Sequence, residues 1–569
     1  MPAVPFPRLA LTAVLILTGA AGRAELTEDI GAYLAGRSAA LDQDFGPAAA
    51  YFGQAVAADP ANPVLLENTL AALLGLGNVS AAIPVADQIV RLGITSQFAH
   101  MTRNAAAAAD GRWEDISVAI DQGQSVGPLV DGLVRAWARL GQGEMTAALA
   151  EFDAVIAAPG LKSFGLYHKA LALAVVGDFE GADAILSLPP TEGMQHTRQS
   201  SLAHAQVLSQ LGRNPDAVAM LDATFGPGLD PTLAALRDRL DAGEAVPFTY
   251  VSDAQTGIAE VYYSVAMALG AETSDSYVLI YGRIAQYLDP GNTEVTLLIA
   301  ELLDGMQRFE LANITFDLIP RDDPAFLAAE LGRAAVLRRA GQSETAVEVL
   351  QQLAESQPAA GVVQATLGDA LRGLSRFAEA KTAYDTALAL YPPGDRARWF
   401  VLYARGITYY QLDQWPQAEA DLRASLALSP DQPQVLNYLG YSLIEEGRDL
   451  AEALALIEQA VAIRPDSGAI VDSLGWALFQ LGQYDEAVMQ MERAAALEPV
   501  DAVVNDHLGD VYWAVGRQTE ARFQWNRALS FDPEGPEAAR IRAKLDVGLD
   551  AVLADEGAEP LRFAADRTP

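Results

Sequence analysis

A pattern that recurs about every 34 residues between Trp399 and Pro533 constrains the fold of this chain more than any other feature. Each unit carries a glycine at its eighth position, a large apolar residue sixteen or seventeen positions later, and a closing proline. The unit starts are Trp399, Pro433, Gly468 and Ala502, the glycines are Gly406, Gly440, Gly475 and Gly509, the large residues are Leu422, Ile457, Met491 and Trp525, and the prolines are Pro430, Pro465, Pro499 and Pro533. A repeat of this length indicates one supersecondary unit used many times.

The spacing inside each unit indicates a pair of helices. Positions 4, 7 and 11 share one helical face, because three or four residues make a turn. The glycine allows the two helices of a unit to come close, and the closing proline ends the second helix because it lacks an amide donor. One unit cannot bury its apolar stripe, whereas stacked units bury it between them. The sequence therefore predicts helical pairs with little or no sheet.

This pattern resembles the tetratricopeptide repeat (TPR), a helix–turn–helix unit of 34 residues. The resemblance implies an all-α fold, a superhelical solenoid of stacked helix–turn–helix units. Turns inside the units are expected at glycines, which are Gly77, Gly111, Gly141, Gly177 and Gly212 in the first half and Gly447, Gly482 and Gly516 in the second.

The strength of the pattern along the chain predicts how it is organised. The predicted regions are a signal peptide (1–24), a degenerate first TPR array (25–225), a linker or eroded repeat (226–256), a second array with a capping helix (257–549) and a disordered acidic tail (550–569). Glycine and proline interrupt the helical pattern in the third region, which suits either a boundary between halves or one eroded repeat.

The N-terminus has the features of a secretory signal. Arg8 precedes the short apolar run Leu9–Leu17, and Gly22 and Ala24 place small residues before a cleavage site at Glu25. The alternative is an uncleaved anchor, but the run is shorter than the ~20 residues of a spanning helix. We therefore expect a periplasmic protein with a cleaved signal.

Composition narrows the classes of partner. The net charge is −36 at pH 7, which disfavours nucleic acid and favours basic partners. The chain has no cysteine, which excludes disulfides, a thiolate nucleophile, cysteine-bound metal and a lipid anchor on cysteine. The expected partners are therefore other proteins or peptides with basic or apolar segments, without nucleic acid and without a lipid anchor.

No catalytic motif stands out from the repeats. The chain lacks a His-Glu-x-x-His zinc motif, a Walker A loop and a Gly-x-Ser-x-Gly elbow. Only His196 and His204 among the histidines lie near each other, and their spacing of eight residues matches no metal motif. We therefore predict no enzyme, no catalytic residues, no cofactor and no metal site.

A binding groove is the remaining candidate for function. In TPR proteins, positions 2, 5, 9, 12 and 13 of the first helices point into a concave groove, and this resemblance selects a set of aromatic and acidic residues. The predicted groove residues are Tyr403, Tyr410, Asn437, Tyr441, Asp472, Trp476, Phe479, Asp506, Asp510 and Trp513. Such a surface suits a peptide with apolar anchors and arginine or lysine. Alternatively, Tyr410, Phe479 and Trp513 pack between units.

The groove differs from that of TPR proteins that grip acidic chaperone tails with lysine and asparagine. Position 5 carries Tyr403, Asn437, Asp472 and Asp506, which argues against an acidic tail as ligand. The tracts 436–441, 471–478 and 505–510 look like those of exported Gram-negative TPR adaptors that partner envelope proteases and peptidoglycan hydrolases. This resemblance implies a periplasmic protein-binding scaffold or adaptor of the cell envelope. A self-associating structural scaffold and an accessory of polysaccharide or outer-membrane export are the alternatives.

Overall fold

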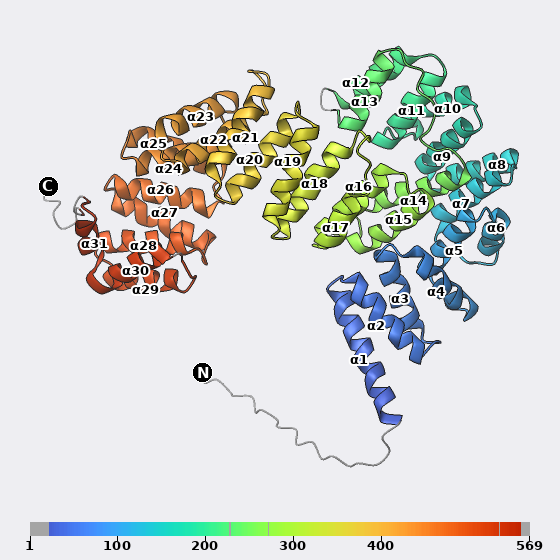
Figure 1. The fold of residues 1–569 in the computed structure, drawn as a ribbon, viewed down its shortest axis with the longest axis horizontal. Coiled ribbons are helices and arrows are strands. Elements are labelled where there is room, and N and C mark those ends of the chain that lie inside the picture. Colours follow the sequence, from blue (N-terminus) through green and yellow to red (C-terminus); the bar gives the residue numbers. More distant parts are fainter. Residues whose placement is uncertain (1–21, 227–228, 271, 534, 559–560, 562–569) are drawn as a thin grey trace. The chain divides into compact units, whose positions relative to one another are not determined.

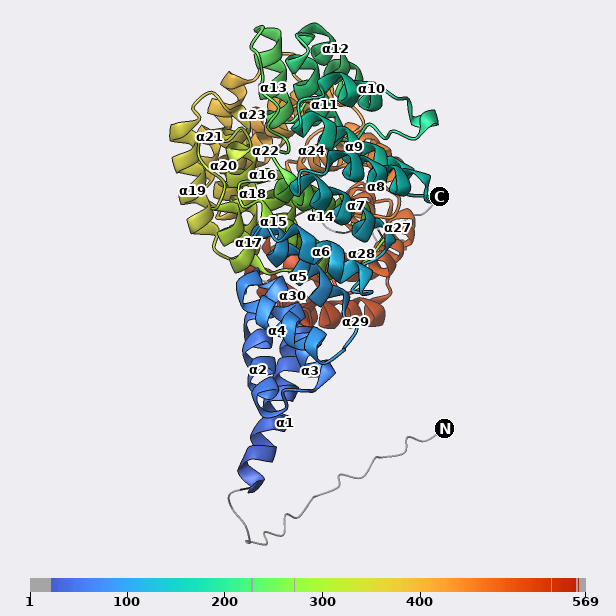
Figure 2. The same cartoon turned by 90° about the vertical axis from the view of Figure 1, so that its right-hand side faces the viewer.

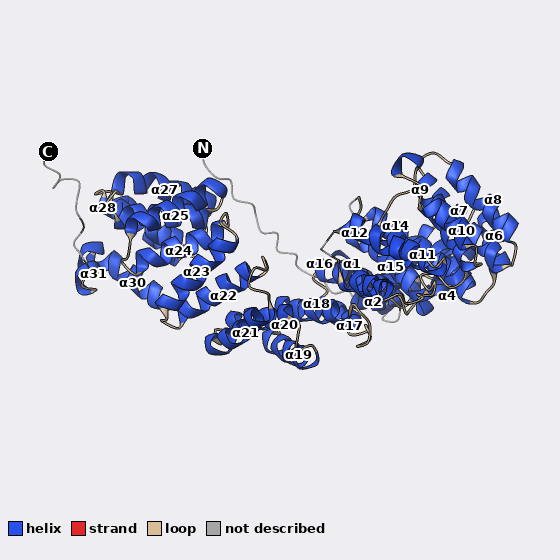
Figure 3. Cartoon of the chain, turned by 90° about the horizontal axis from the view of Figure 1, so that it is seen from above, coloured by secondary structure: helices blue, strands red, loops and turns tan. Residues whose placement is uncertain are grey.

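The computed structural model describes residues 22–561 except 227–228, 271, 534 and 559–560, with side chains described from residue 30 (Figure 1). Within these ranges every regular element is a helix and no strand occurs (Figure 3). The predicted all-α class is confirmed. The predicted signal segment lies largely outside the described residues. No helix of the described ranges has the length and hydropathy needed to cross a membrane.

The chain forms two compact units that divide between Ala346 and Val347. The helices of the first unit are α1 (Gly22–Leu41), α2 (Phe45–Ala58), α3 (Pro63–Gly75), α4 (Val79–Arg91), α5 (Gln97–Ala109), α6 (Trp113–Asp121), α7 (Pro128–Gly141), α8 (Met145–Ala157), α9 (Lys162–Val175), α10 (Phe179–Leu186), α11 (Arg198–Gln210), α12 (Asn214–Phe225), α13 (Pro231–Asp241), α14 (Ala254–Leu269), α15 (Asp275–Leu288), α16 (Thr293–Gly305), α17 (Phe309–Phe316) and α18 (Phe326–Arg339). A short 3-10 helix, η1, spans Pro190–Glu192.

Helix α19 (Ser343–Ser356) crosses the division, and the remaining helices belong to the second unit. They are α20 (Gly361–Gly373), α21 (Phe377–Leu390), α22 (Arg398–Gln411), α23 (Trp415–Leu428), α24 (Pro433–Glu445), α25 (Leu450–Ile463), α26 (Gly468–Gln480), α27 (Tyr484–Leu497), α28 (Ala502–Ala514), α29 (Gln518–Leu529), α30 (Gly535–Val547) and α31 (Leu549–Asp555). Compact packing does not by itself set domain boundaries in a repeat array, so the domain ranges from the sequence stay predictions.

Glycine sits where the two helices of a pair meet, as the repeat pattern predicts. A Cβ atom placed on Gly475 would lie 2.8 Å from Cγ of Met491, and one on Gly509 would lie 2.4 Å from Cδ1 of Trp525. Gly406 and Gly440 face Leu422 and Ile457 in the same way. Each pair of positions that recurs in the sequence is therefore one packing contact between a first and a second helix.

The turns between paired helices also follow the glycines, with one correction. Seven of the eight predicted turn glycines adopt positive φ, the left-handed region that glycine enters without steric cost. Gly141 instead ends α7, and the turn residue is Gly143 with φ of 79°. The reason lies in packing, because a Cβ on Gly141 would lie 2.6 Å from the Trp113 ring of α6.

Two helices of the first unit return to pack against its N-terminal repeats. Helix α14 packs on α5, α7 and α9, while α15 packs on α3, α4 and α5 (Figures 1 and 2). Gly257 of α14 lies so close to Trp137 of α7 that an added Cβ would be 2.3 Å from the ring. The inner face of the N-terminal repeats, formed by their first helices α3, α5, α7 and α9, is thus filled by the chain itself.

The segment 226–256 lies inside the first unit. Helix α13 packs on α12, and its leucines share a core with α11. The following residues form no strand but hydrogen-bond to α11, where the Val246 amide donates to Oγ of Ser209 at 2.9 Å and the Thr249 amide donates to Oε1 of Gln206 at 2.9 Å. These contacts hold the connection between α13 and α14 along the N-terminal repeats.

The C-terminal end departs from the prediction of a disordered tail that begins at residue 550. The predicted capping helix is α30, and a second helix, α31, continues through Asp555. Leu549 and Val552 of α31 are buried. Leu549 joins the buried core of the last repeats and α31 packs on α30, which explains the extra helix.

Candidate functional site

The predicted groove residues lie on four successive first helices of the second unit, α22, α24, α26 and α28. Helix α24 packs beside α26, and α26 beside α28, so these helices share one face, called here the second inner face. Its floor is apolar, because Leu439, Leu474 and Leu508 belong to one buried core. The sequence pattern therefore brings the candidate residues to one side of the unit.

Four half-buried tyrosines gather on α22 and α24 and are called here the tyrosine patch: Tyr403, Tyr410, Tyr438 and Tyr441. Tyr438 meets Tyr403 edge to face at a ring distance of 6.1 Å, and it meets Tyr410 in the same way at 6.0 Å. Burial, together with the charge of Glu445, raises the pKa of Tyr441. All four hydroxyls are therefore neutral near pH 7 and can donate hydrogen bonds.

Tyr438 is the patch member that the repeat pattern missed. It occupies the sixth position of its unit, outside the five positions that line the groove in TPR proteins. Its ring is nevertheless the centre of the patch, because Tyr403 and Tyr410 both pack on it. Asn437 beside it is half-buried, and none of the described donors reaches its Oδ1.

Three stacked rings lie on α26 and α28. Two of them, the predicted groove residues Trp476 and Phe479, are buried in the core of the second unit, at 9% and 6% exposed. Trp476 lies parallel to Phe479 at 5.0 Å and to His507 at 4.2 Å, and its Nε1 donates to Oε1 of Glu445 at 3.3 Å. Burial favours neutral His507, but Asp472, 2.9 Å from its Nδ1, outweighs burial and raises the histidine pKa. Asp472 is thereby engaged within the protein. Nothing in the repeat pattern singled out His507.

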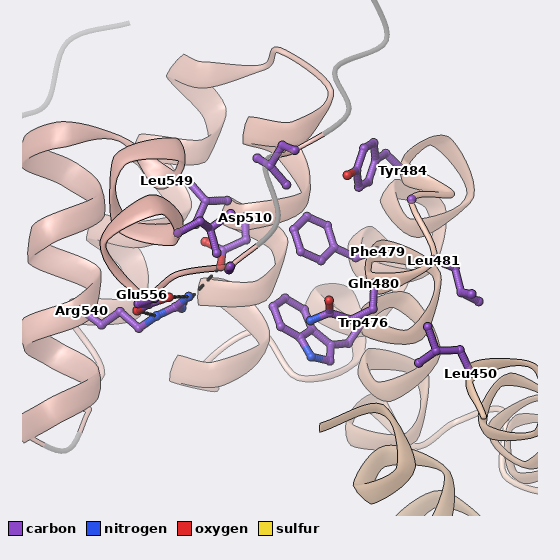
Figure 4. A pocket seen from close by; sticks show the side chains of 14 residues that line it. Leu450, Trp476, Phe479, Gln480, Leu481, Tyr484, Asp510, Arg540, Leu549 and Glu556 are labelled. Atoms are coloured by element: carbon purple, nitrogen blue, oxygen red, sulfur yellow. Dashed lines mark hydrogen bonds and ion pairs between the residues drawn. The ribbon is translucent and has the colours of Figure 1, made fainter. Parts of the chain in front are cut away.

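A pocket of about 580 Å³, called here the end pocket, opens beside this stack (Figure 4). Trp476, Phe479 and Tyr484 line one side, and Leu549 and Leu553 of α31 line another. Charged side chains stand at its edge: Arg540 Nε donates to Glu556 Oε1 at 2.7 Å, and Asp510 lies nearby. The pocket can take an apolar side chain against an aromatic wall.

Two predicted acidic groove residues hold the C-terminal helix instead of facing solvent. The fully buried Nζ of Lys544 lies 2.8 Å from Asp506 and 2.7 Å from Asp510, and Trp525 Nε1 donates to Asp510 at 2.8 Å. Asp510 is 1% exposed. These carboxylates therefore neutralise a buried ammonium group, and α30 depends on them for its position.

Trp513, the third ring of the predicted stripe, is covered as well. Its Nε1 donates to Oδ2 of Asp550 at 2.8 Å, and its ring packs on Trp525 at 5.4 Å. A Cβ on Gly548 would lie 2.6 Å from the Trp513 ring. The junction between α30 and α31 therefore closes this end of the second inner face, while Tyr441 remains half-buried on its open part. None of the described residues groups three potential metal ligands.

Comparison with known proteins identifies the repeats. Family models described as tetratricopeptide repeat match residues 365–402, 403–468 and 443–505. TPR repeat-containing protein PA4667 of Pseudomonas aeruginosa is 31% identical over 163 residues, which are 28% of this chain and 27% of that protein. Tetratricopeptide repeat protein 13 of Homo sapiens is 26% identical over 194 residues, 33% of this chain and 22% of that protein. The matches thus span about a quarter of the length of these relatives.

Solved structures of helical repeats are also similar. The APC/C hetero-tetramer Cut9-Hcn1 contains a chain that is 16% identical with a TM-score of 0.38, covering 92% of this chain and 98% of that one. Yeast Tom70 is 13% identical with a TM-score of 0.34, covering 94% and 99%. The family models therefore show tetratricopeptide repeats over residues 365–505, and such repeats generally serve as scaffolds that bind other proteins or peptides.

Proposed function

We propose that this chain is a non-enzymatic scaffold that binds partner proteins on the second inner face. The observation that carries the proposal is the tyrosine patch, whose half-buried rings adjoin the end pocket through Tyr441, Glu445 and Trp476. Aromatic side chains that present a ring and a hydroxyl are the commonest anchors of protein interfaces. The face offers several such anchors in a row.

Charge indicates which partners this face prefers. Glu445 and Glu446 are exposed at the C-terminal end of α24, close enough to Tyr410 to raise the pKa of its hydroxyl, together with burial. The whole chain carries a net charge of −36. We therefore expect segments with apolar anchors and arginine or lysine, because opposite potentials speed encounter and select the partner.

The cellular setting belongs to the same proposal. The apolar run Leu9–Leu17 and the small residues before Glu25 support export and cleavage, and the tract resemblance supports an adaptor for envelope proteases or peptidoglycan hydrolases. N-terminal sequencing of the protein from its native host is expected to begin at or near Glu25. An intact Met1 on a cytoplasmic protein would overturn the periplasmic part.

A second candidate, self-association through the ends of the array, rests on the first helix. Ile30, Leu34 and Leu41 of α1 are 59%, 57% and 77% exposed, so an apolar stripe remains uncovered there. A sedimentation series over concentration separates the two candidates. A monomer at all concentrations supports the binding scaffold, while a reversible dimer that Leu34→Glu abolishes supports self-association.

The binding proposal is tested by capture from an envelope extract with the double variant Tyr410→Ala and Tyr441→Ala. The matched control is Phe523→Ala, an aromatic residue on the second helix α29 that is 65% exposed. We expect the double variant to lose the proteins that the wild type retains, since truncated anchors typically cost about 2 kcal/mol each. Retention of every captured protein by a folded double variant would show that the second inner face is not the binding surface.

A further inference from the structure

A hollow remains in the first unit where α14 does not fill the N-terminal repeats. It measures about 540 Å³ and lies among α9, α11 and α14, with Phe164, Tyr167, Met267 and Ala268 among its lining residues. Phe164 is half-buried and Met267 is 47% exposed, so the apolar wall is open to solvent. An aromatic or long aliphatic side chain fits such a space.

A second hollow of about 250 Å³ continues from the first. The two share Arg198, Gln199 and Met267, and the second adds the start of α13 and one side of α16. Its lining includes three carboxylates, Asp230, Glu294 and Glu301, against the single guanidinium of Arg198. The chain thus places an apolar hollow directly beside an acidic one.

The ion pairs of the second hollow leave one carboxylate without a cation. Arg198 donates from Nε to Asp230 at 2.7 Å and also ion-pairs with Glu294. None of the described basic side chains ion-pairs with Glu301. Glu301 is exposed to solvent at the mouth of the hollow, and partial burial with the nearby charge of Asp304 raises its pKa, so a cation beside it would be stabilising.

We propose that the two hollows form one docking groove, which binds an extended peptide segment carrying a large apolar residue and, a few residues away, an arginine or lysine. The apolar side chain enters between Phe164 and Met267, and the cation meets Glu301. Charge complementarity selects this occupant, because a neutral segment leaves Glu301 unpaired and an acidic one is repelled. This groove is separate from the second inner face and goes beyond the function proposed for it.

The groove is composite. Phe164 and Tyr167 come from the N-terminal repeats, whereas Met267 and Glu301 come from α14 and α16. Hydrogen bonds join the two walls: Tyr167 donates to Glu260 of α14 at 2.8 Å. The site therefore exists only while α14 is packed on the repeats, and a bound segment stabilises that packing by mass action.

Fluorescence anisotropy with labelled peptides tests this groove on the full chain. The probes are glycine–serine decapeptides with one phenylalanine and one arginine two to four residues apart, with matched peptides in which serine replaces phenylalanine or glutamate replaces arginine. We expect at least one phenylalanine–arginine spacing to bind, and each replacement to weaken it about tenfold or more.

Variants of the protein assign the binding to this groove. Met267→Glu, or the milder Met267→Ser, is expected to weaken the phenylalanine–arginine peptide about tenfold. Glu301→Arg is expected to weaken it similarly and to strengthen the phenylalanine–glutamate peptide, whereas the exposed Glu310→Arg on α17 leaves both unchanged. The double variant Tyr410→Ala and Tyr441→Ala is expected to bind the peptides normally, which separates this result from the proposal for the second unit.

Three results would overturn the groove. They are the absence of binding by every phenylalanine–arginine peptide, unchanged binding in folded Met267→Ser and Glu301→Arg proteins, and loss of binding in the tyrosine double variant.

Discussion

The two units build the same helical pair yet use their inner faces differently. In the first unit, α14 and α15 occupy the inner face of the N-terminal repeats, with Gly257 pressed on Trp137 and Glu260 bonded to Tyr167. In the second unit, none of the other described helices packs extensively across α22 and α24, which carry the half-buried tyrosine patch. The same helical pair therefore occurs with its inner face covered by later helices of the chain in one unit and with large rings left half-buried in the other.

The helix that fills the first inner face and the helix α22 that carries part of the tyrosine patch differ in how far they are buried. Seven consecutive residues of α14, from Gly257 to Tyr263, are buried, so this stretch of the helix is enclosed on all sides. Helix α22 alternates buried residues such as Val401 and Leu402 with half-buried ones such as Tyr403 and Tyr410. The repeat helix α26 is likewise buried from Ile470 to Phe479, so enclosure is not confined to α14, and the half-buried rings of α22 are the feature that suits binding.

The largest expected effect comes from removing Lys544, the buried lysine that holds α30 on the last repeat of the second unit. Lys544→Met removes the buried ammonium group that bridges Asp506 and Asp510, and loss of one partner of a buried ion pair typically costs roughly 3–5 kcal/mol. We expect α30 and α31 to exchange amide hydrogens much faster, measured by mass spectrometry, while the first unit is unchanged. Arg542→Met, at an exposed position of the same helix, is the matched control. Equal protection in both variants would contradict the role of Lys544.

The next largest effect is a destabilisation of the covered inner face of the first unit that leaves the second unit unchanged. Gly257→Leu forces a side chain into Trp137, and overpacking of this kind costs roughly 1–3 kcal/mol. We expect a lower melting temperature and faster exchange in α7 and α14, with α24 and α26 unaffected. Gly53→Leu serves as control, because no atom lies within 4 Å of a Cβ added there. A uniform change across both units would argue against separate packing.

A smaller effect compares two equivalent glycines of the second unit. Gly509→Ala meets the rigid ring of Trp525 at 2.4 Å, whereas Gly475→Ala meets the flexible side chain of Met491 at 2.8 Å. We expect Gly509→Ala to cost about 1–3 kcal/mol and Gly475→Ala less, because methionine adapts its shape. Chemical denaturation measures both, and the larger Gly475→Leu should approach the cost of Gly509→Ala. The reverse order would mean that Trp525 yields more easily than Met491.

The last expected effect is a gradual pH dependence of the closed inner face. Burial raises the pKa of Glu260 to about 8, so the folded protein keeps this group protonated where the unfolded chain ionises it. The contribution of Glu260 to the free energy of unfolding is fully present below the ordinary pKa of a glutamate. It falls by roughly 1 kcal/mol per pH unit as the pH rises toward 8. Glu260→Gln should flatten melting temperature against pH between 5 and 8. Glu272→Gln, at an exposed position, should keep the wild-type slope.

The sequence predicts contacts inside a unit well, because they recur. Gly475 and Met491 keep the same spacing as Gly509 and Trp525, so one pattern reveals every close helix pair. Contacts used only once leave no such trace. The pairing of Lys544 with Asp506 joins residues 38 apart, and Tyr167 with Glu260 joins residues 93 apart. Neither spacing recurs in the chain, and both therefore escape a search for periodicity.

The predicted site residues also fall into two groups, those whose exposure follows from the repeat pattern and those that a single contact covers. Tyr403, Tyr410 and Tyr441 were found from their positions within the unit, since equivalent positions share one face. Asp510 and Trp513 satisfy the same positional rule, but α30 and α31 cover them. A capping helix that packs across the last repeat changes the exposure of its neighbours, and no rule for a single unit contains that information.

Site-specific photocrosslinking in the native host shows directly whether the second inner face is the surface that contacts partner proteins. A benzophenone amino acid replaces Tyr410 on this face, Phe523 on α29 or Phe152 in the core of the first unit, where it is fully buried. We expect crosslinks to other proteins from position 410 and none of these from positions 523 and 152. Crosslinks from position 523 with none from position 410 would contradict this expectation and place recognition on the second helices.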